Sequence, residues 1–205
     1  MESPKISFKV EALKPLSYSA APMALMKLKF RNRAKSVEVV SVVGKIVVFV
    51  EYPLYINVRP ELAREALSFS QVVTGPFKDE AEAEAYLPVT AEMDAALLLR
   101  FKGREVKKIP LVAVLEGFAL YREPESGRVL YYTLPSDPPL ESRFILDFED
   151  WNTIIRTFYG GDLIWIKIRR DVLEKLEELK RSKFYPSYSE MLEDILRRAE
   201  EDGLL

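Results

Sequence analysis

The chain contains neither histidine nor cysteine. The absence of both residues excludes zinc sites of the usual Cys/His kind, cysteine nucleophiles, Ser-His-Asp triads, disulfides and a histidine proton switch. Carboxylate chemistry, Lys, Tyr or Ser nucleophiles, and hard metal ions held by Asp and Glu remain available. Most familiar enzyme mechanisms are therefore closed to this protein.

Amide side chains are scarce, and long hydrophobic runs are absent. One Gln and three Asn stand beside abundant Glu, Lys and Arg, a balance typical of proteins from hot environments. The most apolar stretch, residues 37–50, is interrupted by polar residues and is shorter than the roughly 20 residues that a membrane span needs. The first residues lack the basic start and apolar run of an export signal. We therefore expect a cytoplasmic protein of a thermophile, without membrane insertion.

The overall composition is that of an ordinary globular protein. The 205 residues are 48% hydrophobic and 30% charged, with a formal net charge of −2. This length suits one main core with an appendage. A nearly balanced charge gives no general attraction to nucleic acid or to acidic membranes.

Most of the chain shows the patterns of β-strands. Alternation of apolar and polar residues predicts strands at residues 6–10 and 23–32, and a β-branched run at 37–52 predicts a long central strand with a bulge or bend at Gly44. Residues 109–123 and 129–134 predict a hairpin whose turn contains Gly127. Further strands are predicted at 93–101 and 144–148.

Helical patterns are few in this part of the chain. Leu62, Ala66 and Phe69 have helical spacing after Pro60 and predict a short helical insertion near 60–70. A second short helix is predicted at 149–158, stopped by two glycines. The sequence therefore predicts an α+β protein, with an immunoglobulin-like antiparallel β-sandwich over residues 4–160 and a separate tail over 162–205.

The tail has the order strand, helix, turn, helix. In "IWIKIRR", Ile164, Ile166 and Ile168 point one way and Trp165, Lys167 and Arg169 point the other. We expect Asp171 to cap the first helix and Ser189 to cap the second, each helix carrying an apolar stripe.

These 40 residues resemble the ribbon-helix-helix family of DNA-binding proteins. In that family two chains pair their strands into a ribbon that enters the major groove, and the second helix presents its first N–H groups to phosphate. The resemblance implies that Trp165, Lys167 and Arg169 face the bases and that Ser189 lies at the phosphate. Residues 162–202, however, hold nine basic and eleven acidic residues, a net charge unlike that of a phosphate binder. The favoured interpretation is that the strand completes a sheet and that the helices pack on the sandwich or on a second copy.

A second resemblance covers nearly the whole chain. The segments "SYSAAPMALMKLKFRN", "IPLVAVLEGFALYRE", "DWNTIIRTFY" and "LIWIKIRRDVLEKLEELK" are similar to a bacterial and archaeal family without an assigned function, whose genes recur in clusters encoding nickel–iron hydrogenases. Ala20, Ala21 and Pro22 match an element of that family. Thr90 and Ala91 replace its Pro-Cys pair. The resemblance implies an accessory role in hydrogenase assembly or in the hydrogenase complex.

Polar and aromatic clusters in the sequence have structural explanations that we favour. The acidic run Asp79, Glu80, Glu82 and Glu84 suits a solvated strand or helix face better than a cation site. Glu149 and Asp150, near Asp147, suit a helix N-terminus better than acid–base catalysis. The aromatic pairs and triads are typical of cores and interfaces rather than of catalytic sites: Tyr131, Tyr132, Trp151, Phe158 and Tyr159. No phosphate-binding glycine loop is present.

The sequence therefore predicts no catalytic, cofactor-binding or metal-binding residue. We expect a non-enzymatic accessory protein that binds a protein partner, such as a hydrogenase subunit or maturation factor. The alternative is a dimeric ribbon-helix-helix transcriptional regulator that binds DNA through Trp165, Lys167, Arg169 and Ser189. A homodimer through the tail strand fits both hypotheses.

Overall fold

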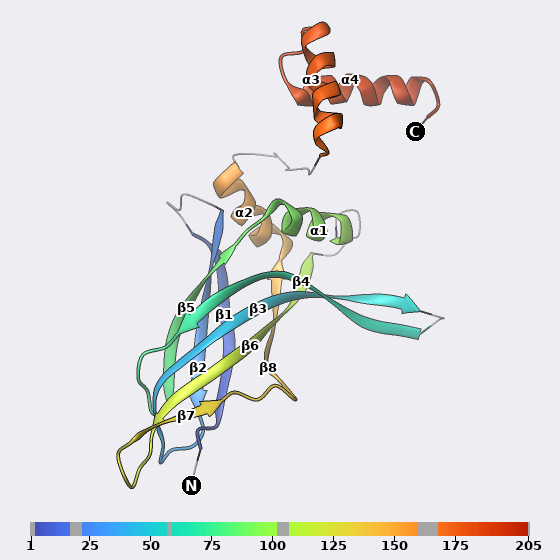
Figure 1. The fold of residues 1–205 in the computed structure, drawn as a ribbon. Helices are drawn as coiled ribbons and strands as arrows, with labels where there is room; N and C mark the ends of the chain where they lie inside the picture. Colours follow the sequence, from blue (N-terminus) through green and yellow to red (C-terminus); the bar gives the residue numbers. More distant parts are fainter. Residues whose placement is uncertain (1–2, 17–21, 57–58, 102–106, 160–167, 205) are drawn as a thin grey trace. The chain divides into compact units, whose positions relative to one another are not determined.

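The computed structural model describes residues 3–16, 22–56, 59–101, 107–159 and 168–204 (Figure 1). The chain divides into two compact units, residues 1–165 and residues 166–205. The described part of the first unit is built mainly of strands, and that of the second unit of helices. The protein is thus α+β, with antiparallel sheets, as the sequence predicts.

The first unit contains eight strands and two helices among its described residues. In chain order they are β1 Ile6–Pro15, β2 Met23–Asn32, β3 Glu38–Ile56, β4 Arg59–Val73, β5 Glu80–Pro88, α1 Ala91–Phe101, β6 Lys108–Arg122, β7 Val129–Thr133, β8 Leu140–Asp147 and α2 Phe148–Tyr159. Seven predicted elements are confirmed, namely the strands near 6–10, 23–32, 37–52, 109–123, 129–134 and 144–148, and the helix at 149–158.

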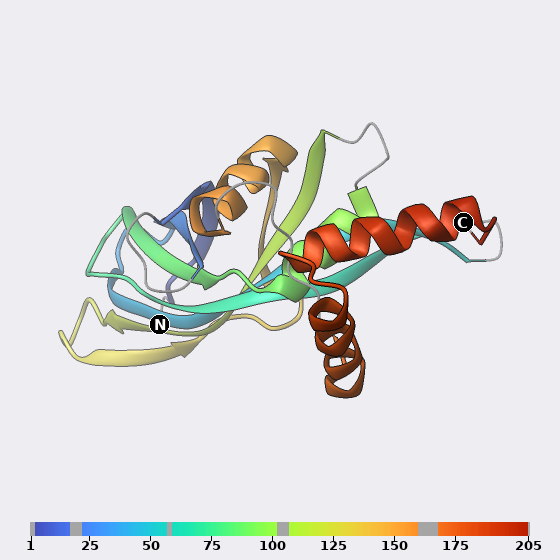
Figure 2. The ribbon, with the colours of Figure 1, turned by 90° about the horizontal axis from the view of Figure 1, so that it is seen from above.

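The strands form two antiparallel sheets that lie in two layers (Figure 2). The first sheet has the order β1-β2-β5, and the second has the order β4-β3-β6-β7, with β8 also paired to β6. Alternate side chains of both sheets point between the layers, as the period of two requires. Phe30 and Met26 of β2 and Ile46 and Leu115 of the second sheet are fully buried there.

Serine side chains join the two sheets along both sides of the sandwich. On one side, Ser68 Oγ donates to the Pro88 carbonyl (2.8 Å), and Ser70 Oγ accepts from the Tyr86 N–H (3.1 Å), which links β4 to β5. On the other side, Ser142 Oγ accepts from the Val10 N–H (2.9 Å), which links β8 to β1. Because backbone groups at a strand edge need partners, these bonds cover parts of edges that would otherwise attract another strand.

The predicted helical insertion near 60–70 is wrong, because these residues form β4 and pair with β3. The pairing register shifts between Val48 and Phe49, where Ala66 and Ser68 lie opposite consecutive β3 residues and Leu67 is the extra residue. This bulge puts Ala66 and Phe69, three positions apart, on one face of the sheet. The apolar spacing therefore imitates a helix in the sequence.

The predicted strand at 93–101 is also wrong, because residues 91–101 form α1. Thr90 Oγ1 accepts a hydrogen bond from the Met93 N–H (3.2 Å) at the start of the helix. Met93, Leu97 and Phe101 are spaced by four residues and are all buried, so they form one helical stripe against the core. Ala, Leu and Met are strong helix formers, and the segment has no β-branched residue.

Gly44 marks a close approach of two strands, and of the predicted bulge or bend the strand pairing excludes the bulge. The register shifts within β3 lie elsewhere, and Gly44 pairs directly with Gly117 of β6. A Cβ on Gly44 would lie 2.6 Å from the Glu116 carbonyl oxygen, and a Cβ on Gly117 would lie 2.2 Å from the Val43 carbonyl oxygen. The two glycines let β3 and β6 approach at this row.

The second unit consists of α3 Arg170–Ser182 and α4 Tyr188–Glu201 (Figure 1). Both helices are confirmed, but both predicted caps are wrong. Arg169 is the N-cap of α3, and Asp171 lies in the first turn. Ser187 caps α4: its Oγ accepts from the Glu190 N–H (3.2 Å) and donates to Glu190 Oε1 (3.3 Å), and Ser189 lies inside the helix.

Candidate functional site on the second sheet

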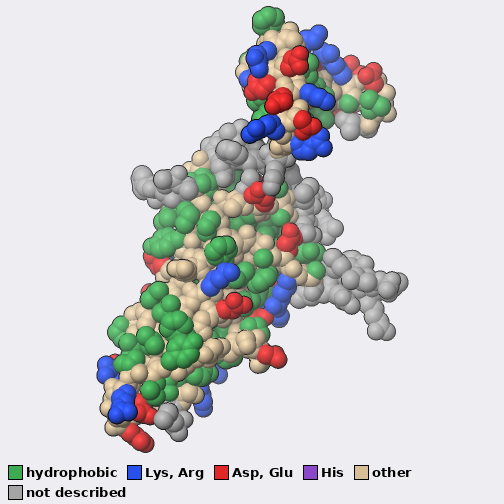
Figure 3. Space-filling model, viewed as in Figure 1, with side chains coloured by type: hydrophobic (Ala, Val, Ile, Leu, Met, Phe, Trp, Pro, Cys, Tyr) green, Lys and Arg blue, Asp and Glu red, His purple; other side chains and the backbone are tan. Residues whose placement is uncertain are grey.

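The outer face of the second sheet, which points away from the core, exposes large apolar side chains. Phe69 and Val73 of β4 are 60% and 62% exposed, and Val129 and Tyr131 of β7 are 50% and 62% exposed. Together with Phe118 of β6, these residues are called the apolar patch below. In Figure 3 hydrophobic side chains gather over β3, β4, β6 and β7 on the face toward the viewer. Grouped exposed apolar residues mark surfaces that bind other molecules.

Neighbouring strands hold the aromatic rings of the patch in place. The rings of Phe118 and Tyr131 lie 5.1 Å apart between centroids and are tilted by 35°. The Nζ atom of Lys45 on β3 lies over the ring of Phe69, 4.7 Å from its centroid. Ring pairs and cation–ring contacts of this geometry stabilise the side chains that make them. The patch is therefore ordered by the sheet that carries it.

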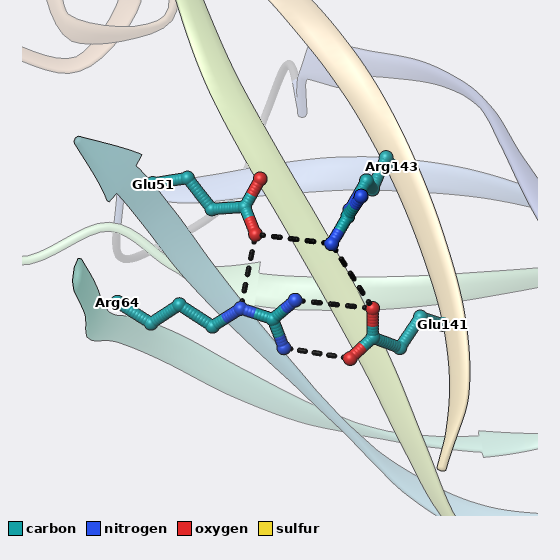
Figure 4. Close-up of polar contacts among 4 residues, drawn as sticks. All are labelled: Glu51, Arg64, Glu141 and Arg143. Atoms are coloured by element: carbon teal, nitrogen blue, oxygen red, sulfur yellow. Dashed lines mark hydrogen bonds and ion pairs between the residues drawn. The ribbon is translucent and has the colours of Figure 1, made fainter. Parts of the chain in front are cut away.

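An ionic network occupies the same outer face at a different place (Figure 4). Arg64 of β4 donates from Nε to Glu51 of β3 (2.9 Å) and from both Nη atoms to the carboxylate of Glu141 on β8 (2.6 and 3.1 Å). Arg143 of β8 lies 3.7 Å from Glu51 and 3.9 Å from Glu141. Two cations and two anions thus join the consecutive strands β3 and β4 to β8, which is distant from them in the sequence.

The network covers apolar residues of β6. Val112 pairs with Phe49 and Arg143, and Val114 pairs with Val47 and Glu141, so both valines lie beneath the charged groups. They are 0% and 8% exposed although they point outward. The hydrogen bonds from Arg64 lower the pKa of Glu141 and raise the pKa of Arg64. This part of the outer face is closed, whereas the apolar patch is open.

Arg64→Ala is expected to lower the free energy of unfolding by about 2 kcal/mol at neutral pH, because Glu51 loses its nearest cation while its side chain stays only 9% exposed. Urea unfolding followed by far-UV circular dichroism measures this loss. The lowered pKa of Glu141 stabilises the fold fully above the ordinary value of 4.5, and this stabilisation disappears as the pH falls through the folded-state pKa.

The difference between wild type and Arg64→Ala should therefore shrink below pH 4.5. Arg122→Ala is the matched control, because Arg122 pairs with Glu38 at a position where both side chains are exposed. It should leave unfolding nearly unchanged. An equal loss in both variants, or a difference that does not vary with pH, would contradict a specific role for the network.

Two residues of the acidic run, Glu80 and Glu84, make side-chain contacts on the first sheet. Glu80 pairs with Lys29 (2.6 Å) and Arg31 (2.5 Å) of the neighbouring strand β2, and Glu84 accepts from the Tyr86 hydroxyl (3.1 Å). The hydrogen bond from Lys29 is the main cause that lowers the pKa of Glu80. Within the described ranges, no group of three or more acidic residues is arranged to hold a metal ion.

The other acidic and aromatic candidates from the sequence mostly lie at a helix N-terminus or in the core. Glu149 and Asp150 are in the first turn of α2, where they favour the helix electrostatically. Trp151 is fully buried, and Tyr132 packs against the core while Tyr131 belongs to the apolar patch. A cavity of about 280 Å³ between β1, β8 and α2 is lined partly by Asp150. It is smaller than most small-molecule sites.

Only part of the proposed DNA-binding set is described by the structure. Trp165 and Lys167 lie outside the described residues. Arg169 is exposed, and its Nε donates to Asp171 (3.0 Å), which lowers the pKa of Asp171. Ser189 is exposed in the first turn of α4. The structure therefore describes only Arg169 and Ser189 of the four residues.

Sequence reasoning missed most residues of the outer face. The sequence predicts a helix at Phe69 and no element at Val73, and therefore places neither residue on the same sheet face as Tyr131. Glu51, Arg64, Glu141 and Arg143 carry no motif and come together only through strand register. Alternation in a strand over 59–73 predicts that Phe69 and Val73 share one face, whereas Arg64 and Ala66 join that face only because of the bulge at Leu67.

Comparisons with known proteins give a family match and distant structural similarities. Residues 62–203 match the model of a protein family of unknown function. No protein with a curated description matches the chain. The crystal structure of Spo0M, a sporulation control protein from Bacillus subtilis, aligns at 10% identity and a TM-score of 0.33, covering 87% of this chain and 56% of Spo0M. The chain thus spans about half the length of Spo0M.

A second solved structure, the solution structure of a protein assigned to the late embryogenesis abundant (LEA) group, aligns at 9% identity and a TM-score of 0.28. The alignment covers 71% of this chain and 72% of the LEA protein. Among the helices that the structure describes, none has both the length and the apolar character to cross a bilayer.

Proposed function

We propose that this chain, which belongs to the DUF6084 family of unknown function, is a non-catalytic interaction protein that binds a protein partner through the apolar patch. The observation that carries the proposal is the exposure of Phe69, Val73, Val129 and Tyr131 on one face of one sheet. Aromatic residues are enriched in protein interfaces, and exposed apolar groups on a folded surface favour association. Because these residues lie on strands of a sheet, they can contact a partner without a change in the backbone.

The proposed partner is a subunit or maturation factor of a nickel–iron hydrogenase, reached in the cytoplasm. Support comes from the segments "IPLVAVLEGFALYRE" and "DWNTIIRTFY", which resemble the family whose genes accompany those of nickel–iron hydrogenases. The first of these segments is β6, which contributes Phe118 to the apolar patch. The role is therefore proposed as assistance in assembly or membership of the complex.

Affinity purification from the native host, with nuclease treatment and mass spectrometry of bound proteins, tests this function. The double variant Phe69→Ser/Tyr131→Ser should recover at least tenfold less of the partner than wild type. Ile145→Ser is the matched control, because Ile145 is 64% exposed on β8 outside the patch. Equal recovery from all three proteins, with unchanged unfolding temperatures, would contradict the proposal.

For the finer architecture, we propose an immunoglobulin-like sandwich and a ribbon-helix-helix-like tail. Two antiparallel sheets around one core support the first. In the second unit, α3 buries none of its residues and α4 buries only Met191, while Leu173 and Leu196 are 40% and 52% exposed. Two amphipathic helices that bury so little favour association with a second pair.

This exposure also supports the alternative function, a dimeric DNA-binding regulator. If it is correct, the double variant Lys167→Ala/Arg169→Ala lowers DNA affinity and flattens its dependence on salt, because phosphate or base contacts are lost. Titration of a DNA fragment library at several salt concentrations measures both quantities. Identical binding by wild type and variant would remove these residues from any DNA contact.

A further inference from the structure

Both helices of the second unit end in the same backbone turn, but with different residues at its left-handed position. At the end of α4, Gly203 has a φ of +69°, and its N–H donates to the Glu200 carbonyl (3.1 Å). At the end of α3, Phe184 has a φ of +55°, and its N–H donates to the Arg181 carbonyl (3.3 Å). In both turns the next N–H donates to the carbonyl five residues earlier (2.8 and 3.0 Å). Glycine is the usual residue at this position.

Phe184 is an unfavourable residue for this turn. Among the described residues it is the only one other than glycine with a positive φ, a conformation that is costly for any residue with a Cβ. Its side chain is 90% exposed, so the ring is hardly buried in return. Strained backbone of this kind persists where function requires the residue. The stability of the turn therefore does not explain why Phe184 is there.

The chain around Phe184 is basic. Residues 179–189 contain three basic residues and no acidic one. Two of the three, Arg181 and Lys183, are exposed, and neither forms an ion pair among the residues that the structure describes. Arg181 and Phe184 also line the same shallow hollow at the end of α3. An exposed ring and unpaired cations thus lie next to each other.

The carboxylates that share a hollow with these cations have other partners. Glu177, which lines a hollow with Arg181, accepts a hydrogen bond from the Tyr188 hydroxyl. Asp194, which lines a hollow with Lys183, pairs with two arginines of α4 (2.5 and 2.7 Å). The cations beside Phe184 are therefore left for a ligand from outside the unit.

This combination fits a short acidic segment of a protein. An exposed aromatic ring beside unpaired cations is complementary to an apolar side chain that has carboxylates next to it. A nucleic acid or an acidic membrane extends far beyond one turn. Residues 162–202 hold eleven acidic residues against nine basic ones, so the rest of the tail would repel either of them. A short segment contacts the turn alone.

We infer that Arg181, Lys183 and Phe184 form a second binding site of this chain, which takes an acidic segment of a protein partner. An apolar side chain of that segment packs on the ring of Phe184, and its carboxylates pair with Arg181 and Lys183. The inference goes beyond the proposed function, because it concerns a surface of the second unit and does not depend on the apolar patch of the first.

Selection from a displayed library of random peptides, with the full-length chain immobilised, tests the inference. Wild type should select peptides in which Asp or Glu neighbours an aromatic or aliphatic residue. Fluorescence anisotropy then measures the affinity of a selected peptide. This affinity should fall at least tenfold in Phe184→Gly, which removes the ring, and in Lys183→Glu, which replaces an ion pair with a repulsion.

Two substitutions in the same unit are matched controls. Leu204→Gly removes a side chain that is 77% exposed directly after the corresponding turn of α4. Lys175→Glu makes the same charge change as Lys183→Glu at an exposed position in α3, before the turn. Both controls should bind the selected peptide like wild type. Equal losses in the controls and in the turn variants overturn the inference.

Amide hydrogen exchange separates a binding role of Phe184 from a structural one. Because glycine suits a positive φ, Phe184→Gly should slow exchange in α3 and α4 while it weakens peptide binding. Faster exchange in Phe184→Gly would show that the ring stabilises the tail, and overturns the inference.

Three results of the binding experiments also overturn it. The first is a wild type that selects no peptide, and the second is a set of selected peptides without acidic residues. The third is binding of a mixed-sequence oligonucleotide or of phosphatidylserine vesicles that Phe184→Gly abolishes, without any selected acidic peptide. In that last case the turn recognises phosphate groups and not carboxylates.

Discussion

Gly117→Ala is expected to destabilise the sandwich by about 3 kcal/mol or more, the largest effect of any glycine substitution in the described chain. The new Cβ would lie 2.2 Å from the Val43 carbonyl oxygen and 2.6 Å from the Gly44 Cα, distances at which backbone must move. The φ angle of +154° is also unfavourable for any residue with a side chain. Urea unfolding followed by circular dichroism measures the change.

Substitutions at two other glycines distinguish the two causes of this loss, namely the clash of the new Cβ and the unfavourable φ angle. Gly127 has a φ of +68° but no atom within 4 Å of an added Cβ, so Gly127→Ala should cost about 1 kcal/mol from backbone strain alone. Gly75 has open space and no positive φ, and Gly75→Ala should change stability by less than about 0.5 kcal/mol. If Gly117→Ala unfolds at the same urea concentration as Gly75→Ala, β3 and β6 do not approach as closely as described.

The Gly44 and Gly117 pair also marks how far sequence reasoning reaches. A lone glycine inside a β-branched run indicates either a bulge or a close approach, and the sequence pattern does not separate the two. Its partner lies 73 positions later in the chain, in the strand Lys108–Arg122. The element types of most strands follow from local alternation, whereas the partner of a strand follows from packing between distant segments.

Errors in element type have equally specific causes. In β4 the bulge at Leu67 changed the phase of the alternation, and residues with high helix propensity such as Ala, Glu and Arg completed the false pattern. In α1 a short apolar run was assigned to a strand, although the spacing of Met93, Leu97 and Phe101 is helical. Short apolar runs do not distinguish a buried helix from a buried strand by composition alone.

The candidate site was less predictable than the fold. The residue type of Tyr131 indicates a core or an interface without separating the two, and three of the other patch residues come from β4 and β6. The pairing register decides which residues of several strands share one surface. When one strand is predicted as a helix, its residues are not assigned to that surface.

Trp151→Ala is expected to lower the free energy of unfolding by about 3–5 kcal/mol, because it removes the largest fully buried side chain and leaves a cavity. Trp151 of α2 also donates from Nε1 to Oδ1 of Asp94 on α1 (2.9 Å), and Asp94 is only 6% exposed. The substitution therefore leaves a buried carboxylate without this donor. Thermal unfolding followed by far-UV circular dichroism measures the loss. Tryptophan fluorescence is unsuitable, because the substitution itself removes one of the two tryptophans of the chain.

A double-mutant cycle separates the hydrogen bond from the packing. Trp151→Phe keeps most of the ring volume but removes the donor, and Asp94→Ala removes the acceptor. If the bond between α1 and α2 stabilises the fold, the two substitutions together cost less than the sum of their separate costs, by about 1–3 kcal/mol. Additive costs would mean that Trp151 acts through packing alone. In that case Asp94 is held at its buried position by other contacts, and the junction of the two helices does not depend on this bond.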